Sequence, residues 1–250
     1  ALMGYVSFIN SLLTAYSCYP SLTEAKVRLD DVEIFIEHQL IMVMFYAQTM
    51  EGIEISRVTK SRVDSYLEES RRGSSVLRSD HHLLLRAHTA GLTASDSVDE
   101  IEENLKRALF FTDHHMEALV DLHMAMLAQG VPHDIWLPDS DSNFVDDVAG
   151  ESIPSIRLFL EKQKIITFIL STIINKSGHA SRVDKRKAEF YLSEVALGTD
   201  KLERILERAI ITGSTVDVAH CSAMVLSLKR FHISLLGQGV HVDFKPRARD

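Results

Sequence analysis

An internal repeat is the feature of this sequence that most constrains its fold. Phe35-Ile-Glu-His-Gln39 matches Phe159-Leu-Glu-Lys-Gln163 at a shift of 124 residues (35 to 159), and Ser56-Arg-Val-Thr-Lys60 matches Ser181-Arg-Val-Asp-Lys185 at a shift of 125 (56 to 181). The second register continues through three further pairs: Tyr66/Tyr191, Glu69/Glu194 and Gly73/Gly198. Toward the end of each copy, His123 and Gln129-Gly-Val131 match His232 and Gln238-Gly-Val240 at a shift of 109 (123 to 232). Self-similarity of this kind indicates two copies of one supersecondary unit.

Each copy is expected to be helical, because apolar residues recur every three or four positions and hairpin dipeptides such as Asn-Gly are missing. In copy one, the boundary signals predict four helices. They run from Ser21 to about Met50, from the Ser56 cap over 57 to 72 with Gly73 as the stop, from 74 to about 91, and from the Ser97 cap to about Gly130. The last of these could be broken at Thr112-Asp113.

Copy two repeats the same order of signals. These are Pro154 at the first turn of a helix, a break at Gly178, caps at Ser181 and Thr199, and stops at Gly198, Gly213 and Gly237. We therefore predict an all-α fold, a tandem duplication of a four-helix up-and-down bundle unit. The expected segments are an N-terminal apolar helix (1–20), repeat 1 (21–131), a linker (132–153), repeat 2 (154–240) and a C-terminal tail (241–250).

Composition limits the function classes. A net charge of −8 and a pI near 5.8 argue against a nucleic-acid surface, which needs clustered Lys and Arg. Two cysteines, Cys18 and Cys221, do not suggest a disulfide framework, so a reducing, cytoplasmic location is expected. The segment 1–16 lacks a basic start and is interrupted by polar residues, so we expect a core or interface helix in place of a signal peptide or membrane span.

The polar residues that both copies share identify the candidate site. If the helices alternate in direction, the depth of a residue along the bundle can be counted from the nearest turn, at about 1.5 Å of rise per residue. This count places one polar group from each helix of repeat 1 at about the same depth. That layer contains Glu37, Glu69, His82 and His123. The equivalent set in repeat 2 is Glu161, Glu194 and His232, with Glu207 depending on the alignment of the third helix.

Carboxylates and imidazoles converging inside a bundle are suitable ligands for iron, manganese or zinc. The predicted architecture resembles the ferritin-like class, whose di-iron sites use Glu-x-x-His pairs. The chain has no Glu-x-x-His; its nearest variants are Asp217-x-x-His220 and the reversed His114-x-x-Glu117. The resemblance is therefore one of architecture only.

The same residues also have a purely structural interpretation. A Glu and a His shared on helices often form a buried hydrogen-bonded pair and bind no metal. In the doublets His81-His82 and His114-His115, neighbouring residues point about 100° apart on a helix, so only one of each pair can face a core site. We expect the doublets to be surface or capping histidines. Asp139-x-Asp-x-Asn143 lacks the Gly and Glu of a calcium loop. No motif for nucleophilic catalysis or phosphate binding is present.

The sequence thus predicts a non-catalytic helical scaffold or interaction module with a protein partner or a second copy, and alternatively a metal-binding bundle.

Overall fold

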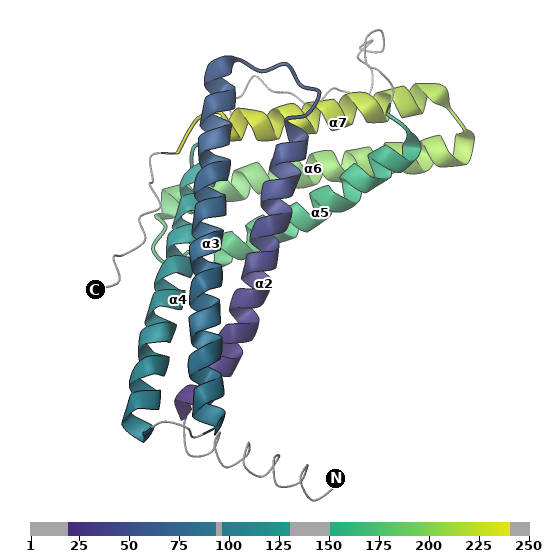
Figure 1. Ribbon diagram of the computed structural model, residues 1–250. Coiled ribbons are helices and arrows are strands. Elements are labelled where there is room, and N and C mark those ends of the chain that lie inside the picture. Colours follow the sequence, from purple (N-terminus) through teal and green to yellow (C-terminus); the bar gives the residue numbers. More distant parts are fainter. Residues whose placement is uncertain (1–19, 94–96, 131–150, 241–250) are drawn as a thin grey trace, which may run out of the picture. The chain divides into compact units, whose positions relative to one another are not determined.

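The computed structural model describes residues 20–93, 97–130 and 151–240, and these form helices with no strand among them (Figure 1). The all-α prediction is confirmed. The helices are α2 (Pro20–Thr49), α3 (Arg57–Thr93), α4 (Val98–Leu127), α5 (Ile153–Lys176), α6 (Arg182–Thr212) and α7 (Thr215–Leu236). The predicted N-terminal helix, most of the linker and the C-terminal tail lie outside the described residues.

Serine caps set the start of several helices, as the sequence predicts. The Ser56 hydroxyl accepts a hydrogen bond from the Thr59 amide (3.1 Å), and the Ser181 hydroxyl accepts one from the Asp184 amide (3.1 Å). These bonds satisfy amides of the first turn that have no partner within the helix. At the other ends, Gly52 (φ +74°) and Gly213 (φ +66°) adopt the left-handed conformation that stops a helix.

Two predicted helix ends are wrong. α3 runs through Gly73 and α6 runs through Gly198, so residues 21–130 and 154–240 each contain three described helices where the sequence predicts four. Both glycines are buried, and a glycine inside a helix costs only about 1 kcal/mol, which packing can offset. Thr199, predicted as a cap, donates its hydroxyl to the Val195 carbonyl one turn earlier (2.7 Å), as a mid-helix threonine does.

The expected break at Thr112-Asp113 is also absent, because α4 is continuous from Val98 to Leu127. The Thr112 hydroxyl is buried and donates to the Ala108 carbonyl (2.8 Å). The hydroxyl shares the Ala108 carbonyl with the backbone amide of its own residue, so it is satisfied inside a helix that continues unbroken.

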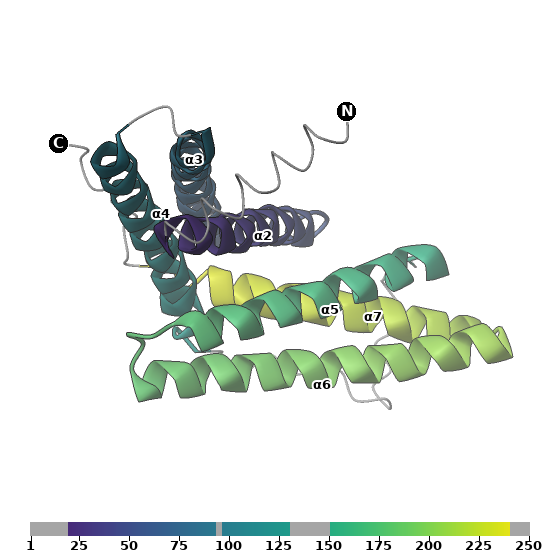
Figure 2. The same ribbon diagram turned by 90° about the horizontal axis from the view of Figure 1, so that it is seen from below.

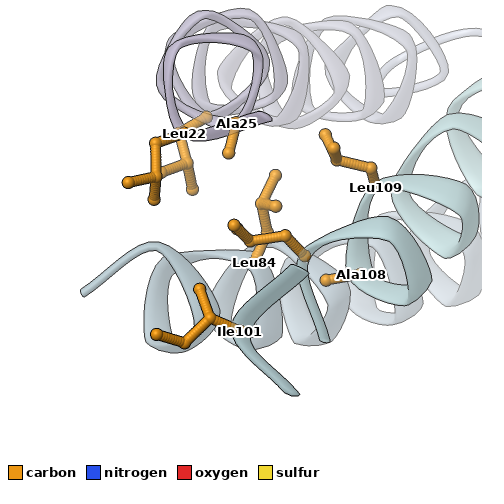
Figure 3. Packing of buried hydrophobic residues seen from close by; sticks show 8 residues of the cluster. Leu22, Ala25, Leu84, Ile101, Ala108 and Leu109 are labelled. Atoms are coloured by element: carbon orange, nitrogen blue, oxygen red, sulfur yellow. The ribbon is translucent and has the colours of Figure 1, made fainter. Parts of the chain in front are cut away.

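The chain divides into two compact units, and each draws residues from α2, α3 and α4. The first unit takes α2 up to Leu40, α3 from Arg71 and α4 up to Leu119. Its apolar core converges from these three helices (Figure 3). The core residues are Leu22, Ala25, Leu29, Leu84, Ile101, Leu105, Ala108 and Leu109.

Close packing in the first unit explains one glycine. A Cβ atom on Gly91 of α3 would lie 2.6 Å from Leu22 Cδ2 and 3.1 Å from Ile101 Cγ2. Both distances are shorter than van der Waals contact, so α2 and α4 approach the α3 backbone more closely than a larger residue allows. Gly91 is therefore a packing residue near the end of α3.

The second unit contains the end of α2 from Ile41, the start of α3 up to Ser70, the end of α4 from Val120, and all of α5, α6 and α7. The last three helices run alongside one another in both views (Figures 1 and 2). Polar contacts link the earlier helix ends to them within this unit. The Arg62 guanidinium donates to the Gly237 carbonyl (3.0 Å), and Lys162 donates to the Gln48 side-chain carbonyl (2.7 Å).

Candidate functional site

The residues predicted as metal ligands lie in three different environments. The side chains of Glu37, His82 and Glu161 are exposed, and those of Glu69 and Glu194 are half-buried. His123 and His232 are fully buried, at 0 % exposure. Only the histidines and the half-buried glutamates are therefore shielded from water in the way a core metal site requires.

The count that placed the repeat 1 ligands in one layer assumed a turn at Gly73, and that premise is wrong. Glu69 and His82 lie on the same continuous helix, thirteen positions apart (69 to 82), which corresponds to about 20 Å of helical rise. Among the described residues, no group of three or more His, Cys, Asp or Glu side chains is arranged to hold a metal ion. The metal site thus stays a prediction from the sequence alone.

Instead, the shared histidines bind the shared tyrosines. In the second unit, the Tyr66 hydroxyl on α3 and His123 Nδ1 on α4 are 2.7 Å apart. Both side chains are buried, and their rings meet edge to face with centroids 5.8 Å apart. A buried hydroxyl and a buried imidazole each need a partner, and here each provides it for the other.

The same pair recurs at the equivalent positions of copy two. The Tyr191 hydroxyl on α6 is hydrogen-bonded to His232 Nδ1 on α7. In addition, His232 Nε2 lies 2.7 Å from the Oε1 atom of Gln163 on α5. Gln163 is another residue that both copies share, so the shared polar positions meet in a three-helix network.

The ionisation of these groups fixes the direction of each bond. Burial lowers the pKa of His123 and of His232 to about 3, so both imidazoles are neutral near pH 7. Burial also raises the pKa values of Tyr66 and Tyr191 well above their usual range. Each protonated tyrosine hydroxyl therefore donates to a histidine Nδ1, and the Nε2–H group of His232 donates to Gln163 Oε1.

Tyr46 of α2 packs against both tyrosine–histidine pairs of the second unit. Its ring lies edge to face with His232 (5.9 Å) and with Tyr66 (6.4 Å). Burial raises the pKa of the Tyr46 hydroxyl, and a contact with the Tyr191 hydroxyl, looser than a well-formed hydrogen bond, offsets part of that rise. Tyr46 thus joins the two pairs into one buried network.

Aromatic side chains enclose the network. Phe45 meets His232 edge to face, with centroids 5.4 Å apart, and packs beside Phe159 at 6.0 Å. Phe231 stacks on Tyr191 at 5.3 Å with nearly parallel rings. These rings exclude water, which is why the histidines lose their proton affinity and why every polar contact in the network is expensive to break.

The chemistry open to this network is limited. Both ring nitrogens of His232 are engaged: Nδ1 accepts from a hydroxyl with the only lone pair of the neutral ring, and Nε2 carries the proton and donates to an amide carbonyl, so neither is available for a metal. An imidazole with a pKa near 3 is a poor general base at neutral pH. The arrangement is suited to holding α3 beside α4, and α5, α6 and α7 beside one another, through buried hydrogen bonds. Within the described residues, Gln163 Nε2 and the Tyr46 hydroxyl are the atoms of the network without a well-formed hydrogen bond.

Two features of the described residues were missed by sequence reasoning. Tyr46 has no shared counterpart, because the shift of 124 residues places Leu170 at its equivalent position. In the first unit, His115 Nδ1 of α4 lies 2.5 Å from Asp80 Oδ2 of α3, and both side chains are buried. The expectation that the histidine doublets are surface residues is therefore wrong for His115.

Comparison with protein-family models, curated proteins and solved structures finds no match for the chain. Within residues 20–93, 97–130 and 151–240, no helix combines the length and the apolar character needed to cross a bilayer.

Proposed function

We propose that the chain is a non-catalytic helical scaffold that assembles with a second copy through the outer face of α6. The observation that carries this proposal is an apolar stripe on that face, with a period of seven residues. It consists of Val183, Phe190, Leu197 and Ile211, with Arg204 at the remaining position. Each of the four apolar side chains is between 50 % and 84 % exposed.

The stripe lies on the side of α6 that faces away from the core of the second unit. The buried residues of this helix include Tyr191, Val195 and Leu202. With about 100° of rotation per residue, Leu197 points to the opposite side from Val195. A monomeric protein places polar residues there, so an apolar stripe at this position supports an interface.

The neighbouring helix and its counterpart add to the argument. α5 exposes Leu158, Ile165 and Phe168, and the positions in α2 that match them by the 124-residue shift are Ile34, Ile41 and Met44, also exposed. Two copies of a unit keep an apolar residue in water at three matching positions. Core packing does not require this, whereas contact with another chain does.

A second copy is the partner that the stripe fits, because the stripe is symmetric about Leu197. Val183 and Ile211 each lie fourteen residues from it (183 to 197, 197 to 211). An antiparallel twofold pairing would set Val183 against Ile211 and Phe190 against the guanidinium of Arg204, a favourable cation–π pair. Such an isologous contact closes as a dimer.

The charges beside the stripe are compatible with this pairing. The same axis sets Lys187 opposite Glu207, which are of opposite sign. It also sets Arg186 opposite Arg208, but Arg208 already forms an ion pair with Asp217 at 2.5 Å, which neutralises it. Asp200 is also set opposite Glu194, and both are acidic, so the flanking charges include one attractive and one repulsive contact and the apolar stripe itself carries the pairing.

Sedimentation equilibrium over a micromolar to submillimolar range tests the proposal. The native chain is expected to dimerise, and Leu197→Glu to raise the dissociation constant at least about hundredfold, since the substitution removes two apolar side chains from the centre of a twofold contact. Ser75→Glu adds the same charge at an exposed position of α3 in the first unit and serves as the control. A native chain that stays monomeric throughout the range would rule out the assembly.

The metal-binding alternative has its own test. We expect less than stoichiometric iron, manganese or zinc in protein purified after metal-replete expression, because His232 uses both ring nitrogens in hydrogen bonds and His123 uses Nδ1. Elemental analysis measures this directly. Stoichiometric metal that disappears in Glu69→Ala, with far-UV circular dichroism unchanged, would favour the metal site over the scaffold.

A further inference from the structure

A groove of about 570 Å³ lies between α3 and α4 in the first unit. Its floor is formed by small side chains, Ala87 and Ala90 of α3 and Ala108 of α4. Leu83 and Phe111 line one end of it. The volume falls in the range typical of small-molecule sites, and the shallow alanine floor leaves room for an apolar body.

The two helices run antiparallel along this groove. The Asp80–His115 contact fixes one level of the seam, and the close approach of Gly91 to Ile101 fixes another. Leu83 and Phe111 therefore lie at about the same height along the two helices. The buried Asp80–His115 pair lies one helical turn further along. The Asp80–His115 pair thus occupies the layer next to the Leu83–Phe111 end of the groove.

Two arginines that line the groove favour the binding of an anionic group. Arg86 of α3 and Arg107 of α4 line the groove at about the same level, one on each helix. Arg86 forms no ion pair with the residues that the structure describes, and Arg107 lies 3.8 Å from Glu103, at the limit of one. Arg86, which has no ion-pair partner among the described residues, and Arg107, which keeps only a long contact to Glu103, thus bring two guanidinium groups to the lining of a groove with small apolar side chains.

We propose that this groove binds an amphipathic carboxylate, a medium-chain fatty acid being the simplest form. The carboxylate lies between Arg86 and Arg107, where each guanidinium can donate two parallel hydrogen bonds. The hydrocarbon chain lies over Ala87 and Ala108 toward Leu83 and Phe111. This site lies in the first unit and does not depend on the assembly proposed for α6.

Isothermal titration calorimetry with dodecanoate, kept below its critical micelle concentration, tests the site in the full chain. One dodecanoate is expected to bind per chain, and dodecyltrimethylammonium, which carries the same tail with a cationic head, to bind at least about tenfold more weakly. Equal binding of the two amphiphiles, or no binding of dodecanoate, would overturn the proposal.

Variants separate the groove from other apolar surfaces. The double variant Arg86→Ala, Arg107→Ala should weaken dodecanoate binding at least about tenfold, because a hydrogen bond to a charged group is worth more than a neutral one. Arg86→Lys, Arg107→Lys keeps the charge and should retain part of the affinity. Lys106→Ala, an exposed neighbour on α4, and Leu197→Glu on α6 should leave it unchanged. Full affinity in the double alanine variant, or a loss in Leu197→Glu, would place the ligand elsewhere.

Discussion

The free energy of unfolding is expected to fall by about 4 kcal/mol when the pH is lowered from 7 to 5. The histidines of the buried network keep a pKa of about 3 in the folded chain, whereas in the unfolded chain they titrate near 6.5. Between those values the unfolded state binds more protons, so stability falls as the pH falls, at up to roughly 1.4 kcal/mol per pH unit for each of His123 and His232. Burial also lowers the pKa values of His81, His88 and His220, which acts in the same direction.

Urea denaturation followed by circular dichroism at pH 7, 6 and 5 measures this slope. The window lies above the ordinary titration range of carboxyl groups, so the histidines dominate it. His179→Gln changes an exposed side chain and should leave the slope intact. Equal stability at pH 7 and pH 5 would mean that the histidines of the network are not held neutral by burial.

His232→Leu is expected to lower the free energy of unfolding by about 3 to 5 kcal/mol at pH 7. Leucine has a similar volume but leaves the Tyr191 hydroxyl and the Gln163 amide buried without the partner that each now has. Each buried polar group that loses its hydrogen bond costs about 1 to 3 kcal/mol. Chemical denaturation at constant pH measures the loss.

His220→Leu, on the same helix, is the matched control for this substitution. His220 is only half-buried, so its replacement is expected to change stability by less than about 1 kcal/mol. A His232→Leu variant as stable as His220→Leu would show that the network contributes little to the fold.

Local signals in the sequence were sufficient to predict most helix ends. Ser56 and Ser181 are caps because their hydroxyls satisfy amides that any helix start leaves open, and this chemistry does not depend on the rest of the fold. The predicted helix ends at Gly73 and Gly198 are wrong because they depend on tertiary packing and not on local chemistry. A buried glycine can be retained inside a helix when tertiary packing outweighs its low helical propensity, and packing is not visible in a single segment.

The repeat identified the right residues for the network but not their chemistry. Tyr66, His123, Gln163, Tyr191 and His232 were all singled out because both copies share them. The glutamates that the matching segments share are exposed or half-buried. The histidines therefore bond to tyrosines in the structure, whereas the sequence predicts glutamates as their neighbours. The partners could not be chosen from the sequence, since depth was counted from a turn at Gly73 that does not exist.

The sequence repeat could not predict contacts of residues that have no matching residue in the other half of the chain. Tyr46 is aligned with Leu170, so comparison of the copies gave no reason to select it. Asp80 and His115 belong to acidic–histidine runs that look like surface features. Which member of each run faces the other helix depends on the rotation of α3 and α4 about their axes, which tertiary packing sets.

We expect the polar residues shared by the matching segments of the sequence to stabilise the fold as paired hydrogen bonds. A double-mutant cycle on Tyr191→Phe and His232→Leu, measured by urea denaturation at pH 7, tests it most directly. We expect a coupling free energy of about 1 to 2 kcal/mol, because the second substitution removes the very group that the first left unpaired. Strictly additive losses in the two single variants would contradict a structural Tyr191–His232 bond and with it this account of the network.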